Sequence, residues 1–197
     1  MKKDLTQQRR EEIIEAAKRC FMSRGFHATS MVDVAREFGM STGHIYNYFP
    51  SKLAIIEEVT ARGLEEFYRD TYTIQSSLDS YEGTLKNMRK ILLPMLSEER
   101  VRIYLELLNE AAHDPVLRGV LTKADAKARE HLMKLSHNLD PSNPMDQAEL
   151  EVRMATFDGI RLRVLNNPEL DKDLICQAVA KRLYTAHEEK CRAAPER

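Results

Sequence analysis

The chain has 197 residues, 31% of them charged, and a formal net charge of -1, so its length allows one large domain or a small head on a larger body. No apolar run approaches the ~20 residues that span a bilayer, and the first residues lack the apolar segment of a secretory signal, so we expect a cytoplasmic protein. Three distant cysteines without Cys-x-x-Cys spacing indicate neither a disulfide framework nor a zinc site, and only a redox role at Cys191 is left open.

The charge is distributed unevenly along the chain. Residues 1–55 hold nine Lys or Arg against six Asp or Glu, a charge of +3, whereas the remainder holds 21 against 25, a charge of -4. A mildly basic head on an acidic body suits a protein that meets phosphate groups at one end.

The first predicted element is a helix over residues 8–23, preceded by a polar arm over residues 1–7. Its apolar positions recur at helical spacing and comprise Ile13, Ala17, Cys20 and Phe21. Gly25 is expected to cap this helix, with Phe26 folding back over its end.

Residues 30–52 predict two short helices joined by a tight turn. The first carries its apolar face at Met31, Val34, Ala35 and Phe38. Ser30 is placed to cap its start, and Gly39 to end it in the left-handed conformation that glycine adopts without steric cost. Ser41 begins a second helix that carries Ile45 inward until Pro50 stops it. This spacing is typical of a helix-turn-helix.

The second helix is rich in polar side chains, namely Ser41, Thr42, His44, Tyr46, Asn47 and Tyr48. The alternative is a helical hairpin packed in a core, but a buried helix would need a partner for each of these groups. Hydroxyls, an amide and phenols are what contacts phosphates and base edges. The candidate DNA-binding residues are therefore Ser30, Ser41, Thr42, Gly43, His44, Tyr46, Asn47, Tyr48 and Lys52.

Residues 10–60 also resemble the DNA-binding domain of TetR-family transcriptional regulators. The matching positions are Gly25-Phe26, Thr29-Ser30, Asp33-Val34-Ala35, Gly39-Met40-Ser41, Gly43, Ile45-Tyr46, Tyr48-Phe49 and Ser51-Lys52-Leu53. The resemblance implies a dimeric, all-helical, ligand-responsive regulator that is usually a repressor. For Lys52 it favours a phosphate contact over an ordinary exposed lysine.

Beyond the motif, a long helix is expected from Leu53 to Asp79, as a lever between the head and the body. Further helices are expected over residues 83–96, 98–112, 115–138, 146–166 and 171–190. The last two carry two apolar faces each, which a second copy of the chain would cover. A larger core within one chain is the alternative, but reading DNA with this motif needs two copies, so we predict a homodimer through residues 146–190.

A small-molecule pocket is implied by this architecture. Its candidate residues are Met88, Leu92, Tyr104, Asn109, Glu110, His113, Phe157 and Arg161, although each apolar one is more often plain core. The sequence shows no nucleotide loop, nucleophile elbow or metal-binding His pair, so we expect no cofactor, no metal and no enzyme.

The prediction is thus an all-α protein with a helix-turn-helix DNA-binding domain over residues 1–50 and a helical ligand-binding and dimerisation domain over residues 51–197. Its expected function is that of a dimeric repressor released from a near-palindromic DNA operator by a small-molecule inducer. The alternative is a helical small-molecule carrier or signalling adaptor that does not bind an operator. Salt discriminates the two, because operator binding weakens steeply as salt rises.

Overall fold

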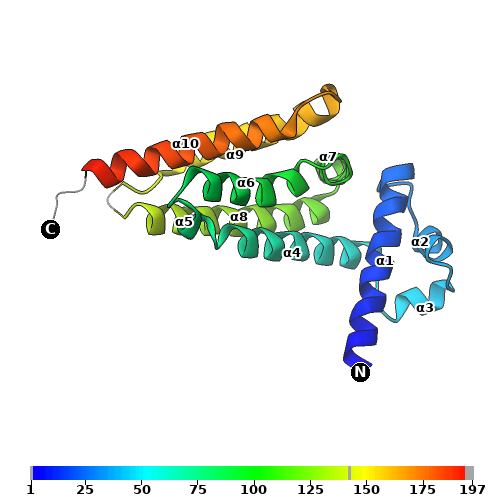
Figure 1. Ribbon diagram of the computed structural model, residues 1–197. Helices are drawn as coiled ribbons and strands as arrows, with labels where there is room; N and C mark the ends of the chain where they lie inside the picture. The colour runs from blue at the N-terminus through cyan, green and yellow to red at the C-terminus, as the bar shows by residue number, and fades with distance from the viewer. Residues whose placement is uncertain (1, 142, 194–197) are drawn as a thin grey trace. The chain divides into compact units, whose positions relative to one another are not determined.

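A computed structural model describes residues 2–141 and 143–193 and shows only helices in these ranges (Figure 1). Among the described residues there is no strand, which confirms the predicted all-α class. The helices are α1 (Lys2–Arg24), α2 (Met31–Phe38), α3 (Thr42–Tyr46), α4 (Lys52–Thr71), α5 (Ile74–Ser77), α6 (Tyr81–Met95), α7 (Glu98–His113), α8 (Pro115–Leu139), α9 (Gln147–Asn166) and α10 (Lys172–Ala193). No helix in the described ranges is both long and apolar enough to cross a bilayer.

Helix α1 begins at Lys2, so the prediction of a polar arm before Gln8 was wrong. The amides of Gln7 and Gln8 donate to the carboxylates of Glu11 and Glu12, at 3.3 and 3.2 Å. Side-chain pairs four residues apart each stabilise a helix by about 0.2–0.5 kcal/mol. Polar residues of this kind therefore extend the helix, although they carry no apolar periodicity.

The helix predicted from Leu53 to Asp79 is in fact two helices, because α4 ends at Thr71 and α5 begins at Ile74. Hydroxyl groups cluster at this break. Thr71 Oγ1 donates to the carbonyl of Phe67 at 2.7 Å, and Thr73 Oγ1 lies 3.3 Å from the carbonyl of Asp70. Hydroxyls that bond to nearby backbone carbonyls compete with continued helix, which accounts for the interruption.

The helices form two compact units, of which unit 1 comprises Met1–Leu64 and Arg102–Lys127 and unit 2 comprises Glu65–Val101 and Ala128–Arg197. Helices α4, α7 and α8 each contribute residues to both units. The predicted boundary at residue 50 between a DNA-binding domain and a ligand-binding domain stays a prediction, since the compact units do not show which residues bind DNA.

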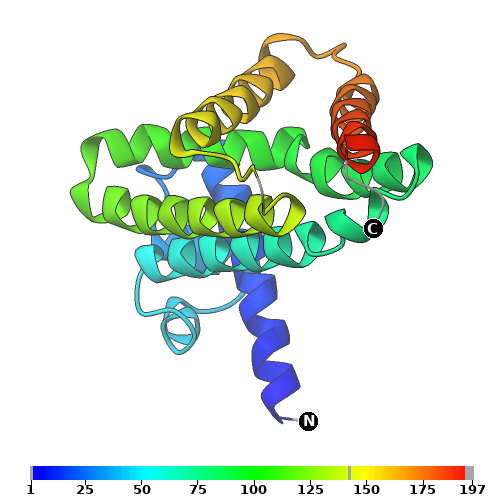
Figure 2. The ribbon, with the colours of Figure 1, turned by 90° about the vertical axis from the view of Figure 1, so that its left-hand side faces the viewer.

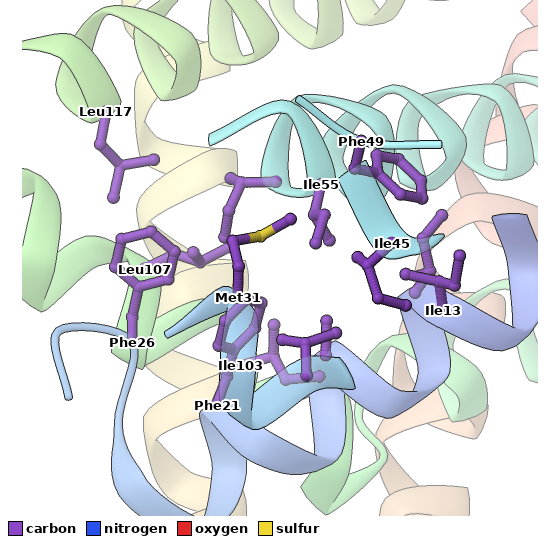
Figure 3. Close-up of a cluster of buried hydrophobic side chains, with 14 of the residues drawn as sticks. Ile13, Phe21, Phe26, Met31, Ile45, Phe49, Ile55, Ile103, Leu107 and Leu117 are labelled. Atoms are coloured by element: carbon purple, nitrogen blue, oxygen red, sulfur yellow. The ribbon is translucent and has the colours of Figure 1, made fainter. Parts of the chain in front are cut away.

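The core of unit 1 joins the helix-turn-helix to the first part of α4 and to α7 and α8 (Figure 3). Its members include Ile13, Phe21, Phe26, Met31, Ile45, Phe49, Ile55, Ile103, Leu107 and Leu117. Ile45 is fully buried, which confirms its predicted inward position. Burying one such side chain contributes about 1.5–3 kcal/mol, so this core fixes α3 against the helices around it.

In unit 2, α6 packs against α10. The Arg89 guanidinium donates from Nε and Nη2 to the two carboxylate oxygens of Asp173, at 2.6 and 2.7 Å. Farther along the pair, the rings of Tyr81 and Tyr184 meet edge to face, 6.2 Å apart. Helix α9 follows α8 and is joined to α10 by residues 167–171 (Figure 2).

Candidate nucleic-acid interface

Helix α2 is capped at both ends as the sequence predicts. Ser30 Oγ accepts from the Asp33 amide at 3.2 Å, and the Ser30 amide donates to Asp33 Oδ2 at 3.0 Å, forming a capping box. These hydrogen bonds from Ser30 lower the pKa of Asp33. Gly39 adopts φ +78° at the other end, which confirms the predicted glycine turn.

Helix α3 begins after Ser41, whose Oγ accepts from the His44 amide at 3.3 Å. Its buried anchor is Ile45, whereas the next residue, Tyr46, is 50% exposed. Exposed Ser41, Gly43 and Asn47 share the solvent side, whereas Thr42 and His44 are half-buried. A short helix is thus fixed by one apolar residue while its polar groups face outward, the arrangement needed to contact a groove of DNA.

Tyr48 is half-buried, and its ring lies 5.3 Å from that of His44. Its backbone carbonyl accepts a hydrogen bond from Arg10 at 2.6 Å. A phosphate contact by the Tyr48 hydroxyl stays a prediction.

The Lys52 ammonium is engaged by the turn between α1 and α2. Its Nζ donates to the carbonyls of Phe26 at 2.6 Å and Thr29 at 2.8 Å, and lies 4.1 Å from the centroid of the Phe26 ring. Burial lowers the pKa of Lys52, and the charge of Glu110 opposes that shift. Lys52 therefore ties the start of α4 to the turn before α2, and its phosphate contact stays a prediction.

Helix α7 contacts the same turn through two carboxylates. Glu106 Oε1 accepts from the buried amide of Phe26 at 2.5 Å, and Glu110 Oε1 lies 3.3 Å from His27 Nδ1. Gly25 has φ +82°, and a Cβ at that position would lie 2.8 Å from Glu106 Oε1. Only glycine permits this close approach without strain, so Gly25 serves both as helix cap and as the place where α7 docks.

The candidate ligand residues fall into two groups. Tyr104, Asn109, Glu110 and His113 belong to unit 1, whereas Met88, Leu92, Phe157 and Arg161 belong to unit 2. Met88 and Leu92 are buried, Asn109 and His113 are exposed, and Arg161 Nη1 donates to Asp158 at 2.8 Å. Glu110 lies beside His27 of the head, and a pocket made by these residues stays a prediction.

Two residues, Arg10 and Glu106, make contacts with the head that the sequence did not predict. Arg10 contacts a carbonyl 38 residues away, and Glu106 contacts an amide 80 residues away. Helical periodicity carries no information about partners at such separations. The sequence feature that could have pointed to these two residues is a charged side chain beside an otherwise apolar helix face.

Among the described residues, no group of three or more His, Cys, Asp or Glu side chains could hold a metal ion. Cys20 and Cys176 are buried, and burial raises the pKa of both thiols. Cys191 is exposed, and its Sγ lies 3.6 Å from His187 Nε2.

Two family models match this chain. Residues 13–59 match "Bacterial regulatory proteins, tetR family", and residues 85–186 match "BetI-type transcriptional repressor, C-terminal". The first model covers the helix-turn-helix described above, and the second covers α7, α8, α9 and most of α6 and α10.

Individual relatives agree with these matches. An uncharacterised HTH-type transcriptional regulator, YfiR of Bacillus subtilis, is 33% identical over 49% of this chain and 52% of its own length. The HTH-type transcriptional regulator TtgR of Pseudomonas putida is 32% identical over 56% of this chain and 52% of its own length. The alignments thus span about half the length of these curated relatives.

Among solved structures, the transcriptional regulator FadR from Bacillus subtilis, in complex with stearoyl-CoA, superposes with a TM-score of 0.69 at 17% identity. The match covers 88% of this chain and 97% of that one. At this identity the likeness establishes the fold alone.

Proposed function

This chain belongs to the TetR family of bacterial regulatory proteins, and we propose that it is a dimeric repressor that a small-molecule inducer releases from a near-palindromic DNA operator. The family and the named relatives are transcriptional regulators rather than enzymes. As a regulator of transcription, the protein would act in the cytoplasm.

The observation that carries the proposal is the two-sided character of α3. Ile45 is fully buried while Tyr46 is half exposed, so the helix is rigidly seated and still presents polar groups outward. Rigid seating matters because base readout requires hydrogen-bonding groups held in a fixed position. Thr42, Gly43 and His44 are proposed to approach base edges, and Ser30 and Tyr46 to hold phosphates.

A second copy is supported by apolar groups exposed on α9 and α10. On α9, Val152 is 66% exposed and Leu162 is 47% exposed, and both belong to one of the two apolar faces predicted for this helix; on α10, Leu174 is 59% exposed. The outer face of α10 carries an open hollow lined by Ala178, Lys181, Arg182, Thr185, Ala186 and Glu189. Small side chains such as Ala178 and Ala186 allow another helix to approach closely. Two heads held in this way would enter successive major grooves about 34–36 Å apart.

Regulation of DNA binding by a small molecule is supported by helices α4, α7 and α8, each of which contributes residues to both units. Helix α7 lies within the region matched by the BetI-type model and contacts the head through Glu106 and Glu110. A ligand that binds one arrangement of these helices more tightly than the other shifts the population of DNA-competent chains by that difference in affinity.

The test is retention of DNA by matched tyrosine variants. Genomic fragments selected by the wild-type chain are used in a gel-shift assay with Tyr46→Ala and, as a control, Tyr72→Ala, which removes a side chain that is 85% exposed outside the head. We expect Tyr46→Ala to weaken retention about tenfold or more, Tyr72→Ala to match wild type, and retention to fall steeply with salt. A wild-type chain that retains no fragment at any salt concentration would favour the carrier or adaptor instead.

A further inference from the structure

Arg10 on α1 contacts the segment that follows the reading helix. Its Nη1 donates to the carbonyl of Tyr48 at 2.6 Å, and its guanidinium carbon lies 4.3 Å from the centroid of the Phe49 ring. Tyr48 and Phe49 lie between the end of α3 and Pro50, where carbonyls have no helical donor ahead of them. Arg10 therefore supplies a charged donor where α3 ends.

The same guanidinium is held by α4. Arg10 Nε lies 3.4 Å from Glu58 Oε1, and Arg10 Nη2 pairs with Glu58 Oε2. Glu58 also accepts from Arg62 Nε at 3.1 Å, one turn further along α4. Burial raises the pKa of Glu58, but hydrogen bonds from Arg10 and Arg62 outweigh it and lower the pKa overall.

This cluster differs from an ordinary surface ion pair. The side chains of Arg10, Glu58 and Arg62 are 31%, 19% and 26% exposed, so solvent screens them incompletely. A guanidinium that binds a carboxylate through two nitrogens and also stacks on an aromatic ring is fixed in orientation as well as position.

Helix α4 is thus attached to both ends of the helix-turn-helix. Lys52 reaches back to the turn before α2, through the carbonyls of Phe26 and Thr29. Glu58 reaches the segment after α3, through Arg10 and the carbonyl of Tyr48. These two attachment points on α4 are six residues apart, which corresponds to about 9 Å along a helix.

We propose that Arg10 is a positioning residue for operator reading, which couples the end of α3 to Glu58 so that α2, α3 and the start of α4 move as one body. This proposal rests on the proposed function, because a movement of α4 matters only if α3 reads DNA. Through Arg10, such a movement would displace the DNA-reading residues. A displacement of α4 then moves the reading helix through the guanidinium as well as through the connection over residues 47–51.

The experiment compares Arg10→Met and Glu58→Gln with Arg9→Met, in the full chain. Arg9 is the matched control, because it is the neighbouring arginine on α1 and, among the described residues, its ion pair is with Glu12 of the same helix, at 2.8 Å. Amide hydrogen exchange in the absence of DNA is measured first. In Arg10→Met and Glu58→Gln we expect amides of residues 45–49 to exchange about tenfold faster, with α6 and α10 unchanged, whereas Arg9→Met matches wild type there.

Operator affinity and its salt dependence are measured second, on a fragment selected by the wild-type chain. Arg10→Met should bind about tenfold more weakly with an unchanged slope of log affinity against log salt, whereas loss of a direct phosphate contact would reduce that slope by about one. A reduced slope, or exchange of residues 45–49 at the control rate in both variants, would overturn the proposal. If the wild-type chain retains no DNA, the proposed function fails, and the exchange measurement still decides whether Arg10 holds the end of α3.

Discussion

Two glycine-to-alanine substitutions should change stability in opposite directions. Gly25 has φ +82°, and a Cβ there would lie 2.8 Å from Glu106 Oε1, whereas a Cβ at Gly63 would meet nothing within 4 Å. An alanine in the left-handed region costs about 1–2 kcal/mol. The Glu106 carboxylate must also move away from the Phe26 amide, and an unpaired buried N–H costs about 1–3 kcal/mol.

For Gly25→Ala these costs add to about 2–5 kcal/mol, which for a chain of this length corresponds to a fall in Tm of about 4–20 °C. Gly63 lies within α4, where alanine is favoured over glycine by about 0.5–1 kcal/mol. Gly63→Ala should therefore raise Tm by about 1–4 °C.

Thermal unfolding followed by circular dichroism gives both values. The double variant Gly25→Ala/Glu106→Ala should lose less than the sum of the single variants, because both remove the same hydrogen bond to Phe26. A Gly25→Ala chain as stable as wild type, or a double variant that loses the full sum of the two single variants, would refute the docking of Glu106 against the turn.

Two further predictions concern unit 2. Hydrogen bonds from Arg89, and after it from Gln177, lower the pKa of Asp173 from 3.8 to about 2, so the stability they contribute is present above the unfolded-state pKa and is lost as pH falls from about 4 towards 2. The difference in urea midpoint between wild type and Arg89→Met should accordingly shrink over that range. A difference that grows on acidification would show that the ion pair of Arg89 with Asp173 does not stabilise the fold through the ionised carboxylate. Val152→Glu should convert the dimer to monomers in sedimentation velocity, since a charge would enter an apolar interface, whereas Val116→Glu, which alters a 61% exposed valine outside α9 and α10, should not. Equal sedimentation of both variants and wild type would contradict an interface on α9.

The helical parts of the fold were largely predictable because their signals are local. Gly25 and Gly39 both adopt positive φ, Ile45 points inward, and the rings of Phe21 and Phe26 lie 5.2 Å apart as the expected fold-back requires. Each of these follows from spacing within a few residues. The beginning of α1 and the break after Thr71 were mispredicted. Hydrogen bonds of polar side chains determine both, and the spacing of apolar residues gives no information about such hydrogen bonds.

The contacts of the site were less predictable, since they join distant parts of the chain. Lys52 was predicted to contact phosphate, which stays a prediction, and the structure shows its ammonium binding carbonyls 23 and 26 residues away. Glu106 and Arg10 have partners at still greater separations. A single sequence indicates which residues are charged and which helix face they occupy, but their partners depend on how the helices pack.

In the proposed function, two copies of α3 occupy successive turns of one DNA duplex. This arrangement is tested most directly by footprinting an operator fragment selected by the wild-type chain, together with the stoichiometry of the complex. We expect two protected half-sites about one helical turn apart, with an even number of chains bound per operator. One isolated half-site protected by one chain would contradict it.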